Sequence, residues 1–203
     1  MQPAGLKPVL DAPRGVALRV WTVGHSTRTA DEFIALLRQH GIRTLVDIRT
    51  VPRSRRVPWT GIDALPQVLS RAGIDYAHLE GLGGLRKPRK DSPNDAWRNE
   101  GFRGYADHMR SRDFERALDE LIGIAAHAPA CVMCAEAVPW RCHRGLLADA
   151  LVVRGVEVLH ILDAGAKPHV LTSFAKVDGT AITYPAGPGE QSRLPVQGDA
   201  EKT

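Results

Sequence analysis

The chain has 203 residues, of which 43% are hydrophobic and 25% charged, and its formal net charge at pH 7 is +4. These values are typical of a soluble globular protein large enough to bury one core without disulfides, and the excess positive charge favours an anionic partner. No apolar run is as long as a membrane span, and residues 1–15 lack the apolar stretch of a signal peptide. We therefore expect a cytoplasmic protein with no membrane segment.

Both ends of the chain are rich in proline and glycine and poor in apolar residues. Segments of this kind cannot bury enough apolar surface to fold. We predict a disordered arm at residues 1–15, one folded domain at residues 16–185 and a disordered tail at residues 186–203.

The folded part alternates between short apolar runs and amphipathic segments. In chain order these predict a strand at 17–24, a helix at 29–41, a strand at 43–49, a helix at 61–73, a strand at 75–84, a polar irregular stretch at 85–104, a helix at 105–127, a strand at 130–135, a helix at 141–155, a strand at 156–162 and a hairpin at 172–185. Thr29 and Glu32 have the spacing of a capping box at the start of the first helix. Asp178-Gly179 is typical of the turn of a hairpin.

Strands that alternate with helices predict the α/β fold class, with right-handed crossovers and a mainly parallel sheet covered on both faces. We predict a single Rossmann-like, three-layer domain whose five strands lie in the order 3-2-1-4-5, with the hairpin added at the C-terminal end. The first and fourth strands are then neighbours. A ligand is expected beyond the carboxyl ends of the strands at this point.

Polar residues gather where these strands end. The first strand leads into His25-Ser26, and the second ends with Asp47 and Arg49. The fourth strand leads into the segment MCAEAVPWRCHR, residues 133–144. Because parallel strands end at one edge of the sheet, we expect these side chains to share a crevice.

Several of these motifs resemble those of the domain-of-unknown-function 488 family. The resemblance rests on TVGHS, VDIRTVPRSRR, LGG, CAEAVPWRCHRGLLADAL and HVLTSFAKVDGTAITYP, and it spans roughly residues 20–185. It implies a compact α/β domain with no settled activity. The positions that match the family's motifs are His25, Ser26, Asp47, Arg49, Pro52, Ser54, Gly83, Gly84, Cys134, Glu136, Cys142, His143 and Arg144.

Four residues are candidates for catalysis. A carboxylate just past a central strand, beside imidazoles and arginines, can act as a general acid or base, and Glu136 has this place. His25 and His143 can polarise a substrate or move protons. Cys142 can be a nucleophile if a helix that begins near residue 139 and the adjacent arginines lower its pKa, and it can equally be a core residue under that helix.

Anion binding accounts for the arginines of the same region, because guanidinium groups and the free N–H groups of a helix start suit a phosphate or carboxylate. A solvated basic loop is the competing explanation for Arg53, Arg55 and Arg56. The basic stretch 86–103 contains Trp97 and is expected to form a lid or to stack a base. The candidate substrate-binding residues are Ser26, Asp47, Arg49, Ser54, Arg55, Gly83, Gly84, Arg141, Arg144 and Trp97.

The three cysteines raise two further readings. Cys131 and Cys134 match C-x-x-C, but residues three apart on a strand point to opposite faces, which favours two buried thiols over a redox pair. The seven residues between Cys134 and Cys142 fall outside the usual spacing of zinc ligands. A magnesium site at Glu136 and Asp47 has no two-metal signature to support it. We expect no metal and no cofactor.

These observations favour an enzyme that performs hydrolysis or group transfer on a phosphorylated, nucleotide-like or nucleic-acid substrate. Cleavage of a nucleotide's glycosidic bond is one such reaction. A non-catalytic module that binds or senses DNA or RNA is an alternative from another class, and a metal-thiolate protein is a third. The oligomeric state is not specified by the sequence.

Overall fold

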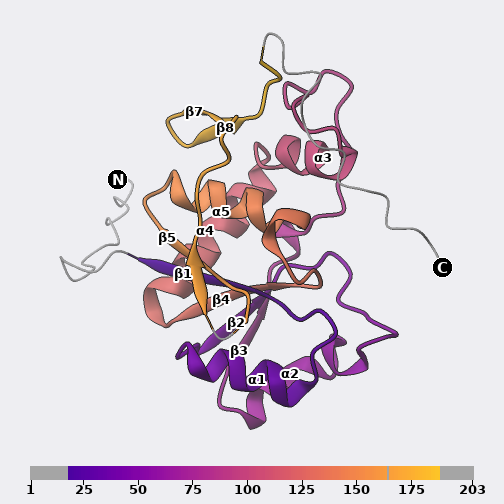
Figure 1. The fold of residues 1–203 in the computed structure, drawn as a ribbon, viewed down its shortest axis with the longest axis vertical. Helices are drawn as coiled ribbons and strands as arrows, with labels where there is room; N and C mark the ends of the chain where they lie inside the picture. Colours follow the sequence, from indigo (N-terminus) through magenta and orange to yellow (C-terminus); the bar gives the residue numbers. More distant parts are fainter. Residues whose placement is uncertain (1–17, 164, 188–203) are drawn as a thin grey trace, which may run out of the picture.

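The structure is a computed structural model that describes residues 18–163 and 165–187 (Figure 1). The arm predicted at residues 1–15 lies outside the described residues, and so does the part of the predicted tail beyond residue 187. Within the described ranges, no helix is both long enough and apolar enough to cross a membrane.

The described residues form a mainly parallel α/β sheet, which confirms the predicted fold class. Its six strands lie in the order β3-β2-β4-β1-β5-β6, and only the pair β5–β6 is antiparallel. The strands are β1 Arg19–Gly24, β2 Thr44–Asp47, β3 Asp75–His78, β4 Ala130–Cys134, β5 Glu157–Ile161 and β6 Ala166–Pro168. The predicted hairpin is present as β7 Lys176–Asp178 and β8 Ala181–Thr183, and Gly179 in its turn has a φ of 59°.

The order of the strands differs from the predicted 3-2-1-4-5, because β4 lies between β2 and β1. Every residue of β4, ACVMC, is apolar and buried. A strand of this kind needs neighbours on both edges and helices on both faces, and β4 has both in its place between β2 and β1. Strand β6, which the sequence did not predict, then covers the far edge of β5.

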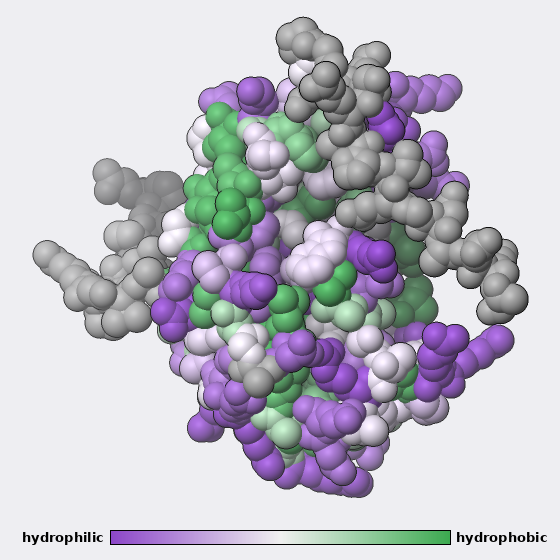
Figure 2. All heavy atoms as spheres, viewed as in Figure 1, coloured by the Kyte–Doolittle hydropathy of each residue, from purple (hydrophilic) through white to green (hydrophobic). Residues whose placement is uncertain are grey.

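Helices cover the sheet on both faces (Figure 1). Helices α1 Ala30–Gln39 and α2 Leu65–Arg71 pack with one apolar cluster, and α3 Glu100–His108, α4 Arg112–His127 and α5 Arg144–Val152 pack with another. Figure 2 shows that the surface is mostly hydrophilic at the lower end of the view, where α1 and α2 lie. The three-layer arrangement therefore agrees with the prediction.

Two cysteines illustrate how β4 serves both layers. Cys131 packs in the cluster of α1 and α2, whereas Cys134 packs in the cluster of α3, α4 and α5. The C-x-x-C pair therefore points to opposite faces of the sheet, as the period of a strand requires.

Side-chain caps explain where several helices begin. The capping box of Thr29 and Glu32 is present at the start of α1. The helix predicted at 105–127 is two helices, because the side chain of Ser111 accepts a hydrogen bond from the N–H of Phe114 and begins α4 anew. Asn99 caps α3 in the same way, so α3 begins inside the stretch that was predicted to be irregular.

The C-terminal part of the domain is joined to α5 by a buried chain of hydrogen bonds. Thr22 Oγ1 lies 2.7 Å from His160 Nδ1, His160 Nε2 lies 2.9 Å from His169 Nδ1, and His169 Nε2 lies 2.8 Å from Asp149 Oδ1. Tyr184 donates its hydroxyl proton to the other oxygen of Asp149, at 2.8 Å. In this chain His160 can accept from the hydroxyl of Thr22 and donate to His169, which suits its neutral form.

The neutral state of His160 makes folding sensitive to acid. Burial, followed by the charges of His169 and Arg144, lowers the pKa of His160 from 6.5 to about 4. Between these pH values the unfolded chain takes up a proton that folded His160 does not, so stability should fall as the pH drops through this window.

We expect His160→Gln to reduce the dependence of the melting temperature on pH between pH 6.5 and about 4. The exposed His127, whose Nδ1 lies 2.7 Å from the carbonyl oxygen of Gly123, provides the control, and His127→Gln should leave the dependence unchanged. Thermal unfolding followed by circular dichroism across this range measures both. An identical pH profile in the wild type and in His160→Gln would show that His160 does not contribute.

Candidate functional site

A cavity of about 400 Å³ lies at the carboxyl edge of the central strands. Because β4 lies between β1 and β2, the segments that follow all three strands meet there. Eight of the candidate catalytic and substrate-binding residues line this cavity: His25, Arg49, Ser54, Gly84, Glu136, Arg141, Cys142 and His143. The shared crevice expected from the sequence is therefore present.

Six other candidates do not line the cavity. Ser26 has a φ of 49° and its N–H donates to the carbonyl of Ala135, so it shapes the turn after β1. Arg55 is exposed, and Gly83 packs against Thr50. Trp97 lines a separate cavity of about 340 Å³. Asp47 and Arg144 are fully buried, and their contacts are described below.

Some residues of the cavity wall could not be recognised from the sequence. Thr50, Leu85 and Asn99 contribute to the wall. Phe102 also lines it, and it belongs to the stretch that was expected to form a lid or to stack a base. Asn99 and Phe102 come from the start of α3, which is distant from β4 along the chain. The aromatic and basic character of the stretch 86–103 was the only signal that this segment meets the site.

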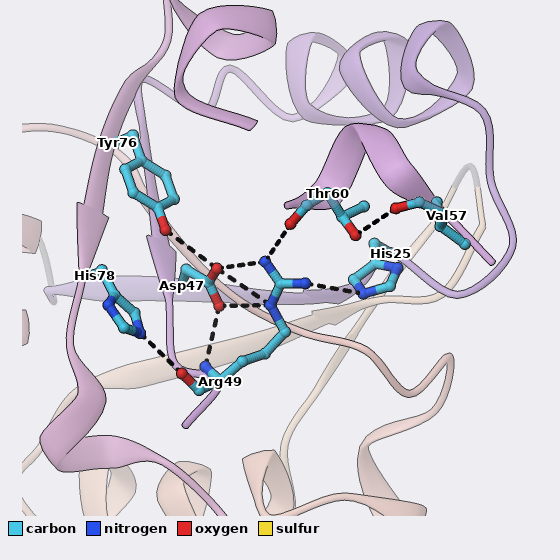
Figure 3. Close-up of polar contacts among 7 residues, drawn as sticks. All are labelled: His25, Asp47, Arg49, Val57, Thr60, Tyr76 and His78. Carbon is cyan, nitrogen blue, oxygen red and sulfur yellow. Dashed lines mark hydrogen bonds and ion pairs between the residues drawn. The ribbon is translucent and has the colours of Figure 1, made fainter. Parts of the chain in front are cut away.

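Arg49 is held by a buried ion pair with Asp47 (Figure 3). Its Nη2 donates to Asp47 Oδ2 at 2.6 Å and to the carbonyl of Thr60 at 2.7 Å, and its Nε donates to Asp47 Oδ1 at 2.9 Å. Tyr76 donates its hydroxyl proton to Asp47 Oδ2 at 3.2 Å. Asp47 therefore positions Arg49 and does not face a ligand itself.

His25 completes this arrangement on the cavity side. Its Nδ1 lies 2.9 Å from the carbonyl of Ser26, so Nδ1 donates and Nε2 is left to accept from Arg49 Nη1 at 3.5 Å. Burial lowers the pKa of His25, and the positive charge of Arg49 acts in the same direction. His25 is therefore a neutral imidazole that orients the guanidinium of Arg49 at the cavity wall.

Arg144 fixes the loop between β4 and α5 from inside the molecule. Its Nη2 donates to the carbonyls of Glu136, at 2.6 Å, and Ala137, at 3.3 Å. Gly24 allows this loop to pass close to β1, because a Cβ at residue 24 would lie 1.7 Å from the carbonyl oxygen of Glu136. Arg144 is fully buried, so it positions the site from behind the cavity wall.

Cys142 lies between the short helix η3, Pro139–Arg141, and α5. Helix α5 begins at Arg144, three residues later than predicted, so Cys142 precedes the helix. Its Sγ lies 2.7 Å from Cys134 Sγ, 3.5 Å from His143 Nδ1 and 3.5 Å from the backbone N–H of Arg144. The thiol therefore has three possible hydrogen-bond donors.

These donors set the ionisation of the two thiols. Burial raises the pKa of Cys142, but the hydrogen bonds from Cys134 and His143, with the positive charges of His143 and Arg144, outweigh it and lower the pKa overall. Burial raises the pKa of Cys134, and the contact with Cys142 raises it further. Cys142 is therefore the thiolate of the pair, and Cys134 is the neutral thiol that donates to it.

His143 is held against Cys142 by the close approach of Gly84. A Cβ at residue 84 would lie 2.3 Å from His143 Nδ1, so only glycine leaves room for the imidazole ring. The ring also packs against the ring of Tyr105 in a tilted arrangement, with 5.0 Å between ring centroids. Gly84, which was predicted as a substrate-binding residue, therefore leaves the space that the imidazole ring of His143 occupies.

The remaining cavity residues are open to solvent. Glu136 and Arg141 are both exposed, and Ser54 is half-buried, with its hydroxyl accepting from the N–H of Val57. In the described part of the chain, no cluster of three or more His, Cys, Asp or Glu side chains has the geometry to hold a metal ion.

A model of the family described as "Domain of unknown function DUF488" matches residues 29–151, which is more than half of the chain. The matched segment includes β2, β4 and the loop with Cys142, whereas His25, Ser26 and the C-terminal hairpin lie outside it. No curated protein and no solved structure matches the chain.

We expect Asp47→Asn to lower the free energy of unfolding by about 3–5 kcal/mol, because it leaves the buried guanidinium of Arg49 without its counter-ion. Tyr76→Phe provides the control: it removes one hydrogen bond to the same carboxylate and should cost only about 1 kcal/mol. Urea denaturation measures both values. Equal losses in the two variants would mean that the ion pair does not stabilise the site.

Proposed function

The chain belongs to the DUF488 family, and we propose that it is an enzyme whose nucleophile is the thiolate of Cys142. The reaction is a hydrolysis or a group transfer on an anionic substrate that is phosphorylated or nucleotide-like. Glu136 is the general acid or base, and the arginines of the cavity hold the anionic group.

The observation that carries this proposal is the pairing of Cys142 with a buried arginine. In the described part of the chain, Arg144 forms no ion pair with a carboxylate, and its acidic neighbours are the thiols of Cys134 and Cys142. An isolated buried charge is strongly unfavourable, so a thiolate at Cys142 is the counter-ion that this arginine needs. Since Cys142 also lines the cavity, the same thiolate can reach a substrate.

The chemistry follows from the neighbours of the thiolate. Cys142 attacks the electrophilic atom of the bound group, and the electron pair of the broken bond goes to the leaving group, which takes a proton from His143. Glu136 then removes a proton from water or from an acceptor hydroxyl, which attacks the covalent intermediate and releases the Cys142 thiolate. Each protein group ends the cycle as it began once Glu136 returns its proton to solvent and His143 takes one up.

The cationic lining supports an anionic substrate. Three arginines line the cavity: the buried Arg49 and the exposed Arg53 and Arg141. Planar guanidinium groups bind phosphate oxygens in pairs. Phe102 in the same wall provides an aromatic face for a base, which is why a nucleotide-like substrate is included in the proposal. A free thiolate needs a reducing compartment, so the proposal retains the cytoplasm as the location.

A nucleic-acid-binding module remains the second candidate, supported by one observation. Arg53, Arg55 and Arg56 lie within four residues of the chain and are all exposed, and Arg53 lines the cavity. Binding of a labelled single-stranded oligonucleotide that weakens steeply with salt would favour this candidate.

We expect Cys142 to react with iodoacetamide at a rate that stays nearly constant from pH 8 down past pH 5, because a lowered pKa keeps it a thiolate in this range. An ordinary thiol would lose about tenfold in rate for each pH unit below its pKa. Mass spectrometry of the peptide that contains Cys142 gives the rate, and the buried Cys131 is the internal control that should stay unlabelled. A tenfold loss per pH unit at Cys142 would rule out the thiolate.

We expect Glu136→Gln to slow turnover by about a hundredfold or more while binding of the substrate persists. A panel of nucleoside monophosphates and p-nitrophenyl phosphate supplies the substrates, and inorganic phosphate is the binding probe. Glu157→Gln is the matched control, because Glu157 is at the opposite, amino edge of the sheet in a salt bridge with Arg19. Arg141→Ala should weaken phosphate binding. Full turnover in Glu136→Gln would show that Glu136 has no part in the mechanism. If the wild type turns over none of these substrates and Glu136→Gln binds phosphate more tightly than the wild type does, a binding module is favoured.

A further inference from the structure

The two thiols at the cavity belong to different elements that meet side by side. Cys134 is the last residue of β4, and Cys142 follows η3 at the other end of the intervening loop. Both residues are buried yet both line the cavity. We propose that Cys134 and Cys142 form a reversible oxidation site, at which a peroxide converts the two thiols into an intramolecular disulfide.

The geometry of the pair carries this proposal. The two Sγ atoms are 2.7 Å apart, whereas a disulfide bond is about 2 Å long, so bond formation needs a movement of less than an ångström. The loop between the two cysteines is anchored by the hydrogen bonds of Arg144 to the carbonyls of Glu136 and Ala137. The sulfur atoms are therefore held together in the reduced protein and are not brought together by oxidation.

The environments of the two sulfurs assign their roles. The N–H of Arg144 and the imidazole of His143 contact Cys142 and stabilise its thiolate, which is the form that attacks a peroxide. The sulfur of Cys134 contacts the carbonyl oxygen of Glu136 at 3.9 Å and the sulfur of Cys142 at 2.7 Å, which suits a neutral thiol. Cys142 is thus the peroxide-reactive sulfur, and Cys134 is the thiol that resolves the product.

The reaction balances in two steps. The Cys142 thiolate attacks one oxygen of the peroxide, the O–O bond breaks, and hydroxide or alkoxide leaves, so that Cys142 becomes a sulfenic acid. The Cys134 sulfur then attacks the Cys142 sulfur, the S–O bond breaks, and the oxygen leaves as water with the proton of Cys134. The two sulfurs together lose two electrons to the peroxide, and a dithiol reductant returns them.

Oxidation changes more than the two sulfurs. The disulfide removes the negative charge that faces the buried guanidinium of Arg144, and it removes the proposed nucleophile from the cavity. The expected loss of activity rests on the proposed function, whereas formation of the disulfide rests only on the geometry of the thiols. Mass spectrometry therefore tests whether the disulfide forms, and its result does not depend on whether the proposed enzyme activity is found.

Cys131 provides a control within the same strand. It lies three residues before Cys134 on the opposite face of the sheet, it is fully buried among the residues that pack on α1 and α2, and its pKa is raised by burial. It has no thiol partner among the described residues, so it should remain reduced under the same conditions.

The experiment uses the full chain treated with hydrogen peroxide, then denatured, alkylated and digested with trypsin. Cleavage after Arg141 separates the two cysteines, so the disulfide appears as two linked peptides whose summed mass is reduced by two hydrogen atoms. Because Cys131 shares a tryptic peptide with Cys134, the variant Cys131→Ala makes the assignment unique. We expect the linked peptides in the wild type and in Cys131→Ala, and their loss after treatment with dithiothreitol.

Variants of the pair separate the two roles. In Cys134→Ser, Cys142 should be oxidised to a sulfenic acid that dimedone traps. In Cys142→Ser, Cys134 should react with peroxide at least about tenfold more slowly than the pair does in the wild type. The proposal is overturned if the wild type keeps both thiols under peroxide, or if Cys142 is oxidised to a sulfinic acid while Cys134 stays free. These outcomes are read in the wild type, so they hold even if a variant fails to fold.

Discussion

The buried guanidinium of Arg144 is the constraint on which the rest of the site depends. It begins α5, donates to the carbonyls of Glu136 and Ala137, and its backbone N–H approaches the sulfur of Cys142. One side chain therefore fixes the loop after β4, places Glu136 at the cavity and supplies the positive charge beside the thiolate. Without it, the carbonyls of Glu136 and Ala137 would lose the donor that holds the loop in place.

Two buried arginines serve the site in different ways because their counter-ions differ. Arg49 has a full carboxylate partner in Asp47, so the pair is neutral and acts as a rigid wall next to His25. Arg144 has no such carboxylate among the described residues and instead faces the thiols. The positive charge of Arg144 therefore lies beside the thiols of Cys134 and Cys142, where it can stabilise a thiolate.

The position of β4 explains why distant segments of the chain meet. An apolar strand without a single polar residue belongs at the centre of the sheet, and ACVMC fills that place between β1 and β2. The predicted order placed β4 on the other side of β1, where it would also have had a neighbour on each edge. The apolar character of β4 therefore requires an interior place, but it does not determine which two strands are its neighbours.

The sequence alone determined the α/β class, the alternation of elements, the capping box of α1 and the crevice at the strand ends. The reason is that the spacing of apolar residues and the residue types that cap a helix are properties of short segments of the chain. It also identified eight residues of the cavity wall. Only the tertiary structure decided which charges neutralise each other: it buried Asp47 with Arg49, placed Arg144 behind the loop and brought Cys134 against Cys142. Those pairings depend on the order of strands and on the path of a loop between them, and neither is encoded in the spacing of residues along the chain.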